Sequence, residues 1–260
     1  MSTTSEVVIY GNPDLLAAAS AARLVTRLVD LQAAKGSASL VLTGGGTGIA
    51  VLEQLRQSPA RDAIDWSRLD LYWGDERFVP REDDERNEKQ ARQALLDHVP
   101  VDPERVHAMA PSDGEFGDDP DAAAAAYADV LAAHARPEDH GDVPTFDIML
   151  LGLGPEGHTA SIFPESPAAY EYDRSVVAVR NCPKPPPTRV SLTFPAIRSA
   201  AEVWLLTTGE GKADAVAMAL AGAGEVQLPV AGARGRRRTL WLVDKAAASK
   251  LGNVPTTPHM

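Results

Sequence analysis

Short apolar runs alternate with amphipathic stretches along the 260-residue chain, as is typical of an α/β protein. The apolar runs predict strands at residues 6–10, 39–42, 69–73, 146–151, 176–179, 189–193, 203–207 and 239–243. Helices are predicted at residues 13–35, 49–57, 87–96, 121–135 and 212–220. This alternation favours a mainly parallel sheet with helices on both faces. Because no repeat or long linker interrupts it, we expect one α/β domain over residues 1–252 and a disordered tail at 253–260.

Two of the helices are defined by different signals. For the first, Pro13 suits the first helical position, leucines such as Leu24 and Leu28 recur at roughly helical spacing, and Gly36 ends it. The alanine-rich stretch 121–135 is predicted to be a surface helix from propensity alone.

Composition restricts the class of protein and its partners. The net charge of -11 argues against general nucleic-acid binding. No apolar run approaches the roughly 18 residues of a membrane span, and the first residues lack the pattern of a signal peptide. A single cysteine, Cys182, excludes an intramolecular disulfide. We therefore expect a cytoplasmic protein, a monomer or small homo-oligomer, with a small-molecule substrate and with no membrane or nucleic-acid partner.

The stretch 146–163 carries the strongest functional signal. A predicted strand breaks into three glycines, Gly152, Gly154 and Gly157, and His158 follows at once. In α/β proteins, ligands lie outside the carboxyl ends of the strands, which is where this turn should be. Histidine can both take and give a proton near neutral pH. The stretch therefore predicts a site with His158 as its acid–base group.

The same glycines match the spacing of a dinucleotide-binding fingerprint, G-x-G-x-x-G, after a strand. A true fingerprint opens a long helix whose N-terminus holds the pyrophosphate. Here Pro164 and Pro167 leave room for about two turns at most. We therefore do not expect a nucleotide at this turn.

A second glycine-rich turn spans residues 43–48, between a predicted strand and a helix. Its exposed amides suit an oxyanion, most often a phosphate. The turn lacks the Lys-Ser/Thr pair of a P-loop, and a simple tight turn is the alternative interpretation.

Several charged residues stand where strands or helices begin or end. Asp75, Glu76 and Arg77 follow the strand at 69–73, Arg189 begins a strand after the proline-rich loop 181–187, and Lys212 begins a helix after glycines. Each is either a functional group or an ordinary surface charge. The arginine-rich run 234–238 is interpreted as an exposed loop. Because there is no G-x-S-x-G, H-E-x-x-H or paired-cysteine motif, we expect neither a serine hydrolase of the α/β type nor a metal site.

Taken in order, these motifs resemble the 6-phosphogluconolactonase family, which is related to glucosamine-6-phosphate deaminases. The resemblance extends from about residue 7 to 248. It rests on the blocks LTGGGT at 42–47, WGDERFVP at 73–80 with Asn87 after it, LGLGPEGHTASIFP at 151–164, RVSLT at 189–193, GKA at 211–213, and Trp241 with Asp244.

The chain departs from the family pattern in three places. Thr43, Gly46 and Gly48 replace two serines and a proline at the first turn, which leaves the amides available. Glu156 replaces the usual aspartate before Gly157 and keeps the charge on a longer side chain. Arg86 precedes Asn87 where a serine is common.

The resemblance implies a sugar-phosphate isomerase-like fold of three layers. It also implies hydrolysis of 6-phospho-D-glucono-1,5-lactone to 6-phosphogluconate, in the oxidative pentose phosphate pathway, without metal or organic cofactor. His158 would serve as general base and then general acid, and a nearby helix start would keep it neutral. Either Glu156 or Asp75 would orient the imidazole, and Arg77 or a glycine amide would stabilise the oxyanion.

For the substrate phosphate implied by this resemblance, we nominate two cations and the first glycine turn. These residues are Arg189 and Lys212 together with Gly44, Gly45, Gly46 and Thr47.

Two other functions remain open from the sequence. One is an amino-sugar-phosphate deaminase/isomerase, in which Asp75 would abstract the proton. The continuation Arg77-Phe78-Val79-Pro80 and the run after His158 favour the lactonase. The other is a sugar-phosphate sensor without turnover, which the presence of both His158 and Asp75 disfavours.

Overall fold

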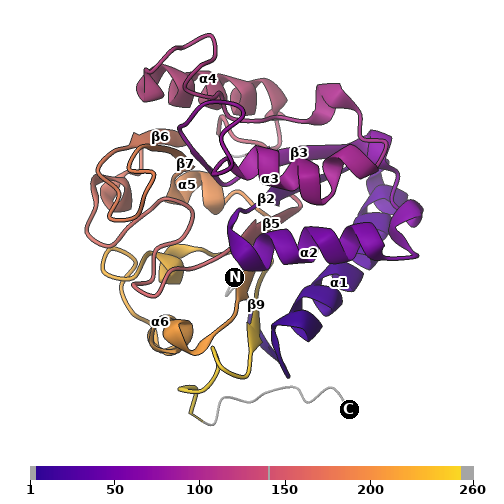
Figure 1. Ribbon diagram of the computed structural model, residues 1–260, viewed down its shortest axis with the longest axis vertical. Helices are drawn as coiled ribbons and strands as arrows, with labels where there is room; N and C mark the ends of the chain where they lie inside the picture. The colour runs from indigo at the N-terminus through magenta and orange to yellow at the C-terminus, as the bar shows by residue number, and fades with distance from the viewer. Residues whose placement is uncertain (1–3, 140, 253–260) are drawn as a thin grey trace.

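The computed structural model describes residues 4–139 and 141–252. The predicted tail at 253–260 lies outside these residues. Within them, a six-stranded sheet forms the centre of the molecule, and all its neighbouring strands run parallel (Figure 1). In spatial order the strands are β1 (Thr4–Tyr10), β9 (Arg238–Asp244), β8 (Glu202–Thr207), β5 (Ile148–Leu151), β2 (Ala38–Leu42) and β3 (Leu69–Trp73). The prediction of a mainly parallel sheet is confirmed.

Side chains alternate across this sheet, so each face has its own apolar core. In β5, for example, Ile148 and Leu150 belong to one core, and Met149 and Leu151 to the other. The first face is covered by α1 (Pro13–Lys35), α2 (Gly45–Gln57) and α3 (Asn87–Ala94). The second is covered by α4 (Pro120–His134), α5 (Phe194–Ile197), α6 (Ala213–Leu220) and a smaller sheet. The three-layer prediction is confirmed.

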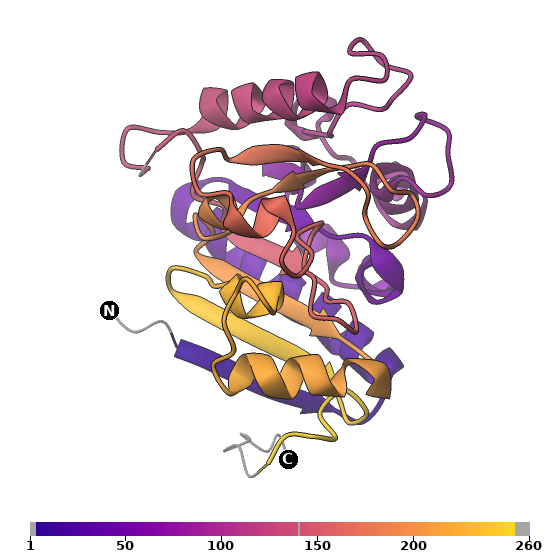
Figure 2. The same ribbon diagram turned by 90° about the vertical axis from the view of Figure 1, so that its left-hand side faces the viewer.

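The smaller sheet is antiparallel and consists of β4 (Asp75–Arg77), β7 (Arg189–Leu192) and β6 (Val176–Val179). The sequence analysis placed these three charged residues after the strand at 69–73 and predicted no strand there, so β4 was missed. The pairing of β4 with β7, more than a hundred residues away, makes it a strand and sets Arg77 opposite Arg189. Figure 2 shows α4 lying across this sheet.

Most predicted boundaries agree with the structure within a few residues. The first helix is confirmed at 13–35, where the Asn12 side chain accepts from the backbone N–H of Leu15 and Gly36 adopts a left-handed φ of 83°. The second helix starts at Gly45 rather than at residue 49, so most of the glycine turn is its first helical turn. The helix at 120–134 is not only a surface helix, because Tyr127 and Leu131 are buried against the second core.

Short 3₁₀ helices complete the secondary structure, at Arg61–Ala63, Trp66–Arg68, Leu96–His98, Pro103–Arg105, Pro167–Tyr170, Glu210–Lys212 and Pro229–Gly232. Arg234, Arg236 and Arg237 of the arginine-rich run are exposed in a loop before β9, as predicted, and Arg234 pairs with Glu225. Arg238 is instead the first residue of β9 and pairs with Glu6. In the part of the chain that the structure covers, no helix is both long and apolar enough to cross a membrane.

The strand order reverses direction beside β2. From β2 the chain continues to β3 on one side, whereas the next strand of this sheet, β5, pairs with the other side of β2. In open α/β sheets, ligands bind outside the carboxyl ends of the strands at such a reversal. Both glycine-rich turns, after β2 and after β5, lie at this point.

The packing of α1 predicts a large difference between two of its leucines. Leu28 is fully buried and Leu15 is 55% exposed. Leu28→Ala should lower the free energy of unfolding by about 2–5 kcal/mol, because it removes buried methyl groups and leaves a cavity. Leu15→Ala should change it by no more than about 0.5 kcal/mol. Denaturant unfolding of both variants checks this, and similar losses would contradict the assignment of the α1 core face.

Candidate active site

A cavity of about 570 Å³ opens at the carboxyl ends of β2, β5 and β8, beside β4. Nearly every residue that the sequence nominated lines it: Gly44, Gly45, Gly46, Thr47, Asp75, Arg77, His158, Arg189 and Lys212. Glu156 is absent from the lining but hydrogen-bonds to His158. Residues from five separate segments of the chain therefore meet at one place.

The turn after β5 folds His158 back over its own backbone. The N–H of Gly154 donates to the carbonyl of His158 at 2.9 Å. A Cβ on Gly154 would lie 2.0 Å from His158 Nδ1, so only glycine leaves room for the imidazole. Gly157 has a φ of +87°, and a Cβ there would lie 2.1 Å from Leu228 Cδ1. The ring of His158 stacks on Phe163 with 4.6 Å between centroids.

Glu156 determines which nitrogen of this imidazole carries the hydrogen. Its Oε1 lies 2.8 Å from Nδ1 of His158, and an ionised carboxylate can only accept, so Nδ1 carries the hydrogen and Nε2 is free to act as a base. Burial lowers the pKa of His158 and outweighs the opposing charge of Glu156. Burial also disfavours ionisation of Glu156, but a backbone hydrogen bond, His158 and Lys184 outweigh it and lower its pKa to about 2. A neutral imidazole beside a charged carboxylate follows at neutral pH.

The expected helix start beside His158 is not found. The residues after it form turns, and the next helical element is the 3₁₀ helix at Pro167–Tyr170. Burial, rather than a helix dipole, therefore keeps His158 neutral.

Asp75, the other candidate for orienting His158, has different partners. Its Oδ2 accepts a hydrogen bond from Ser161 Oγ at 2.6 Å and lies 4.0 Å from Arg189 Nη1. Asp75 is buried but lines the cavity, so its charge faces the space where a ligand would bind. Of the two carboxylates, Glu156 is the one hydrogen-bonded to the imidazole.

Arg189 fastens the proline-rich loop. Its guanidinium donates to three successive carbonyl oxygens, from Nε to Pro186 at 3.0 Å and from Nη2 to Lys184 at 3.2 Å and Pro185 at 3.3 Å. Only 5% of the residue is exposed. Its remaining nitrogen, Nη1, faces Asp75, so Arg189 both lines the cavity and holds one of its walls.

Two lysines place ammonium groups at the cavity. Lys212 donates to the carbonyl of Leu153 at 2.7 Å, and burial together with the nearby Lys184 lowers its pKa against the pull of Glu156. Lys184 Nζ lies 3.1 Å from Glu156 Oε2. Sequence reasoning missed Lys184, since its place in a proline-rich loop gave no signal of proximity to His158.

Glu76 follows Asp75 on β4, so its side chain lies on the other face of this strand, and it anchors α3. Its carboxylate accepts from the backbone N–H groups of Arg77, Asn87 and Glu88 at 2.7 to 2.9 Å. It thus caps α3 from another element, because Arg86 at the N-cap provides no side-chain cap. Burial raises the pKa of Glu76 to about 7, against the opposing effects of Arg86 and these backbone donors.

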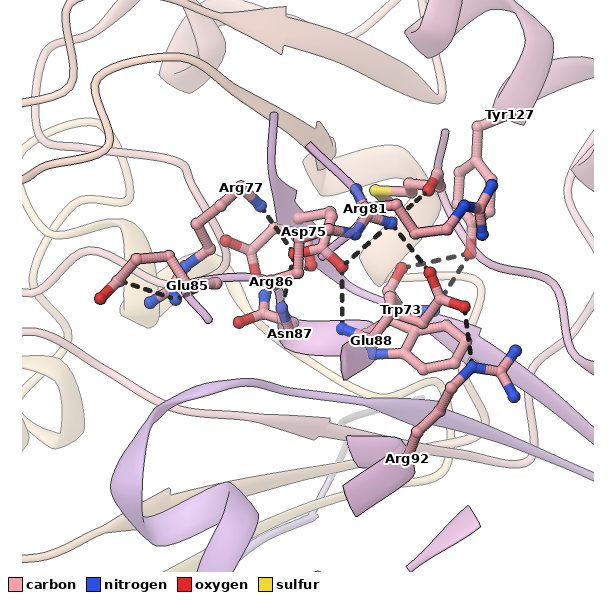
Figure 3. Close-up of polar contacts among 12 residues, drawn as sticks. Trp73, Asp75, Arg77, Arg81, Glu85, Arg86, Asn87, Glu88, Arg92 and Tyr127 are labelled. Carbon is pink, nitrogen blue, oxygen red and sulfur yellow. Dashed lines mark hydrogen bonds and ion pairs between the residues drawn. The ribbon is translucent and has the colours of Figure 1, made fainter. Parts of the chain in front are cut away.

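Arg86 completes the anchor from inside the protein. Its fully buried guanidinium lies 3.7 Å from Glu76 Oε2 and donates to Glu88 Oε2 at 2.9 Å and to the carbonyl of Met109 at 2.8 Å (Figure 3). A serine at this position would be too short for these contacts.

The contacts of Glu76 and Arg86 position Asn87 against the first glycine turn. Nδ2 of Asn87 donates to the carbonyl of Asp75 at 2.9 Å. Its Oδ1 is so close to Gly44 that a Cβ there would lie 1.9 Å away. The sequence noted Asn87 only as part of a motif, and the structure gives it a role in joining β4, α3 and the turn.

Arg77 reaches the cavity from the same strand as Asp75. Its Nη1 donates to the carbonyl of Glu85 at 2.7 Å and lies 3.5 Å from the carboxylate of that residue. Its Nε is buried and has no hydrogen-bond partner within residues 4–139 and 141–252. In the same ranges, no cluster of three or more His, Cys, Asp and Glu side chains could hold a metal ion.

The sequence pattern of the family described as glucosamine-6-phosphate isomerases/6-phosphogluconolactonase matches residues 11–241. This chain belongs to that family. It is 63% identical over 251 residues to the 6-phosphogluconolactonase of Streptomyces coelicolor, covering 96% of both chains. It is 56% identical over 248 residues to that of Mycobacterium tuberculosis, covering 95% of this chain and 99% of the relative.

A solved structure gives the same result in three dimensions. The 6-phosphogluconolactonase of Trypanosoma brucei matches this chain with a TM-score of 0.83 at 28% identity, covering 96% of this chain and 100% of the other. The glucosamine-6-phosphate isomerase/6-phosphogluconolactonase fold therefore extends over nearly the whole chain.

The contact between Asn87 and Gly44 predicts a difference in stability between alanine substitutions at two glycines of the same turn. Gly44→Ala should lower the free energy of unfolding by about 1–3 kcal/mol, because the new Cβ meets the buried side chain of Asn87. A Cβ on Gly46 would meet nothing within 4 Å, so Gly46→Ala should not destabilise the protein. Thermal and denaturant unfolding of both variants checks this. Equal destabilisation would show that Asn87 does not support the turn.

Proposed function

We propose that this protein is a 6-phosphogluconolactonase, which hydrolyses 6-phospho-D-glucono-1,5-lactone to 6-phosphogluconate in the oxidative pentose phosphate pathway. The observation that carries the proposal is the Glu156–His158 pair at the edge of a cavity that also contains Arg77, Arg189 and Lys212. The high identity to two bacterial 6-phosphogluconolactonases supports the same substrate. A direct assay with freshly prepared lactone, corrected for spontaneous hydrolysis, tests it.

In the proposed mechanism, His158 moves a single proton twice. Nε2 accepts a proton from water while the water oxygen attacks the lactone carbonyl carbon. The tetrahedral intermediate then collapses, the bond from this carbon to the ring oxygen breaks, and the imidazolium returns the proton to that oxygen. Glu156 stabilises the transient imidazolium through Nδ1–H. A strained ester needs little more than this base and correct positioning.

The charge that develops on the carbonyl oxygen needs a donor, and Arg77 or a backbone amide of the first glycine turn is proposed for this role. The phosphate is proposed to bind Lys212 and Arg189 together with the amides of Gly44, Gly45 and Gly46 and the side chain of Thr47, which line the same cavity. Because the whole protein is strongly acidic, affinity for a dianion has to come from such local cations. We propose no metal or organic cofactor.

The rival activity, amino-sugar-phosphate deamination, would use Asp75 as the base. Asp75 lines the cavity, but its Oδ2 already accepts from Ser161 Oγ and faces Arg189. In the part of the chain that the structure describes, His158 Nε2 makes no hydrogen bond, whereas Nδ1 is held by Glu156. Parallel assays with the lactone and with glucosamine 6-phosphate separate the two activities, and binding of both without turnover of either would indicate the sensor.

The absence of a disulfide-forming cysteine pair and the metabolic role lead us to propose a cytoplasmic enzyme. Its partner is a small sugar phosphate rather than a nucleic acid, and the enzyme acts as a monomer or small homo-oligomer.

The first prediction for the mechanism concerns His158. His158→Ala should lower kcat for the phosphorylated lactone by at least about 100-fold, the size expected for loss of a general base. The exposed His98 provides a matched control, and His98→Ala should retain activity. Circular dichroism and unfolding curves establish that both variants fold. Near-normal turnover in folded His158→Ala would remove this residue from the chemistry.

The second prediction concerns the phosphate. Lys212→Ala should lower kcat/KM for the phosphorylated lactone by roughly 10- to 100-fold, since a charge-assisted hydrogen bond contributes about 1.5–3 kcal/mol. It should barely affect the poor activity on unphosphorylated gluconolactone. Arg189→Ala should show the same selectivity, with added loss of stability because Arg189 also holds the loop. Equal losses on both substrates would place these residues at the carbonyl or in the fold instead.

A further inference from the structure

Lys184 lies on the far side of Glu156 from His158. Its Nζ is 3.1 Å from Oε2 of Glu156, while the other oxygen, Oε1, is 2.8 Å from Nδ1 of His158. The three side chains are linked through one carboxylate, which is shared between an ammonium group and an imidazole. The side chain of Lys184 is 43% exposed and also lines the cavity.

The backbone of Lys184 is held in place independently of its side chain. The carbonyl of Lys184 accepts from Arg189 Nη2, and the loop is closed by a hydrogen bond of 2.9 Å from the N–H of Cys182 to the carbonyl of Pro187. The loop that Arg189 holds therefore places the ammonium group of Lys184 beside Glu156.

We propose that Lys184 is a positioning residue that sets the basicity of His158 by sharing the carboxylate of Glu156. The proposal rests on the role of His158 as the general base. With Lys184 present, part of the negative charge of Glu156 is offset, and the imidazole remains an unprotonated acceptor. Without Lys184, the whole charge acts on His158 and favours the imidazolium, which cannot accept a proton from water.

The other charged groups around His158 do not replace Lys184. Asp75 faces the imidazole from β4 and favours its protonation, as Glu156 does. Arg77 lines the cavity from β4, where it contacts Glu85, and Arg189 is turned toward the loop carbonyls and Asp75. Lys212 donates to Leu153. Lys184 is the cation hydrogen-bonded to Glu156 in the described part of the chain, and it lowers the pKa of His158.

The test is an NMR titration of the His158 ring in the resting protein, assigned by the signal that disappears in His158→Gln. In Lys184→Met the pKa of His158 should rise by about one unit, the size expected for loss of one nearby cation. Lys184→Arg, which retains the charge, should restore a value near that of the parent. Lys250→Met removes a lysine that is ion-paired with Asp214 at the surface, and it should leave the titration unchanged.

The pH profile of kcat provides the second measurement. The acid limb should move to higher pH in Lys184→Met by the same amount as the titration, so that kcat falls at neutral pH and recovers when the pH is raised. An unchanged His158 titration in Lys184→Met would overturn the proposal. So would a rise in KM for the phosphorylated lactone with no shift in the titration, since Lys184 would then be a substrate ligand.

The two measurements separate this inference from the proposed activity. The titration requires no substrate, so a shifted pKa in a protein that fails to hydrolyse the lactone would refute the activity alone. An active enzyme with an unshifted titration would refute the role of Lys184 alone.

Discussion

The hydrogen bonds that the carboxylate of Glu76 accepts are the interaction on which the rest of the site depends. This carboxylate accepts three backbone N–H groups, one from its own strand and two from the first turn of α3, and so joins a strand end to a helix start. Because Asp75 and Arg77 flank it on the same strand, anchoring Glu76 also fixes both side chains that face the cavity. Asn87 extends this order to the glycine turn after β2. One buried acid thus determines the relative positions of three cavity walls.

The features that could be predicted from the sequence are those that depend on neighbours along the chain. The helix at 13–35 has its proline, its leucine spacing and its terminal glycine within a single segment. The turn that ends in His158 is likewise a local motif, and glycine is required there because the imidazole folds back over Gly154. The parallel sheet follows from alternation of strands and helices. The family resemblance predicts that the nominated residues share one site, and nearly all of them line the cavity.

What could not be predicted depends on contacts between distant segments. Strand β4 is three residues long and exists because β7 pairs with it. The helix after Leu42 begins among glycines, whose low propensity concealed its true start. No sequence pattern indicates that Arg189 binds three carbonyls or that Lys184 reaches Glu156. The sequence predicts that a helix dipole keeps His158 neutral, whereas the structure assigns this effect to burial, which a local pattern does not reveal.

The hydrogen bonds from Arg189 to the proline-rich loop affect which substitutions this enzyme can accept during evolution. The guanidinium binds main-chain oxygens at residues 184 to 186 and no side chain of that segment. Carbonyl oxygens are present whatever amino acid occupies a position, so substitutions there can alter the chemistry presented to a ligand while the loop keeps its anchor. The anchor of this loop is therefore indifferent to which side chains occupy residues 184 to 186, whereas the wall built on Glu76, Arg86 and Asn87 depends on the side chains themselves.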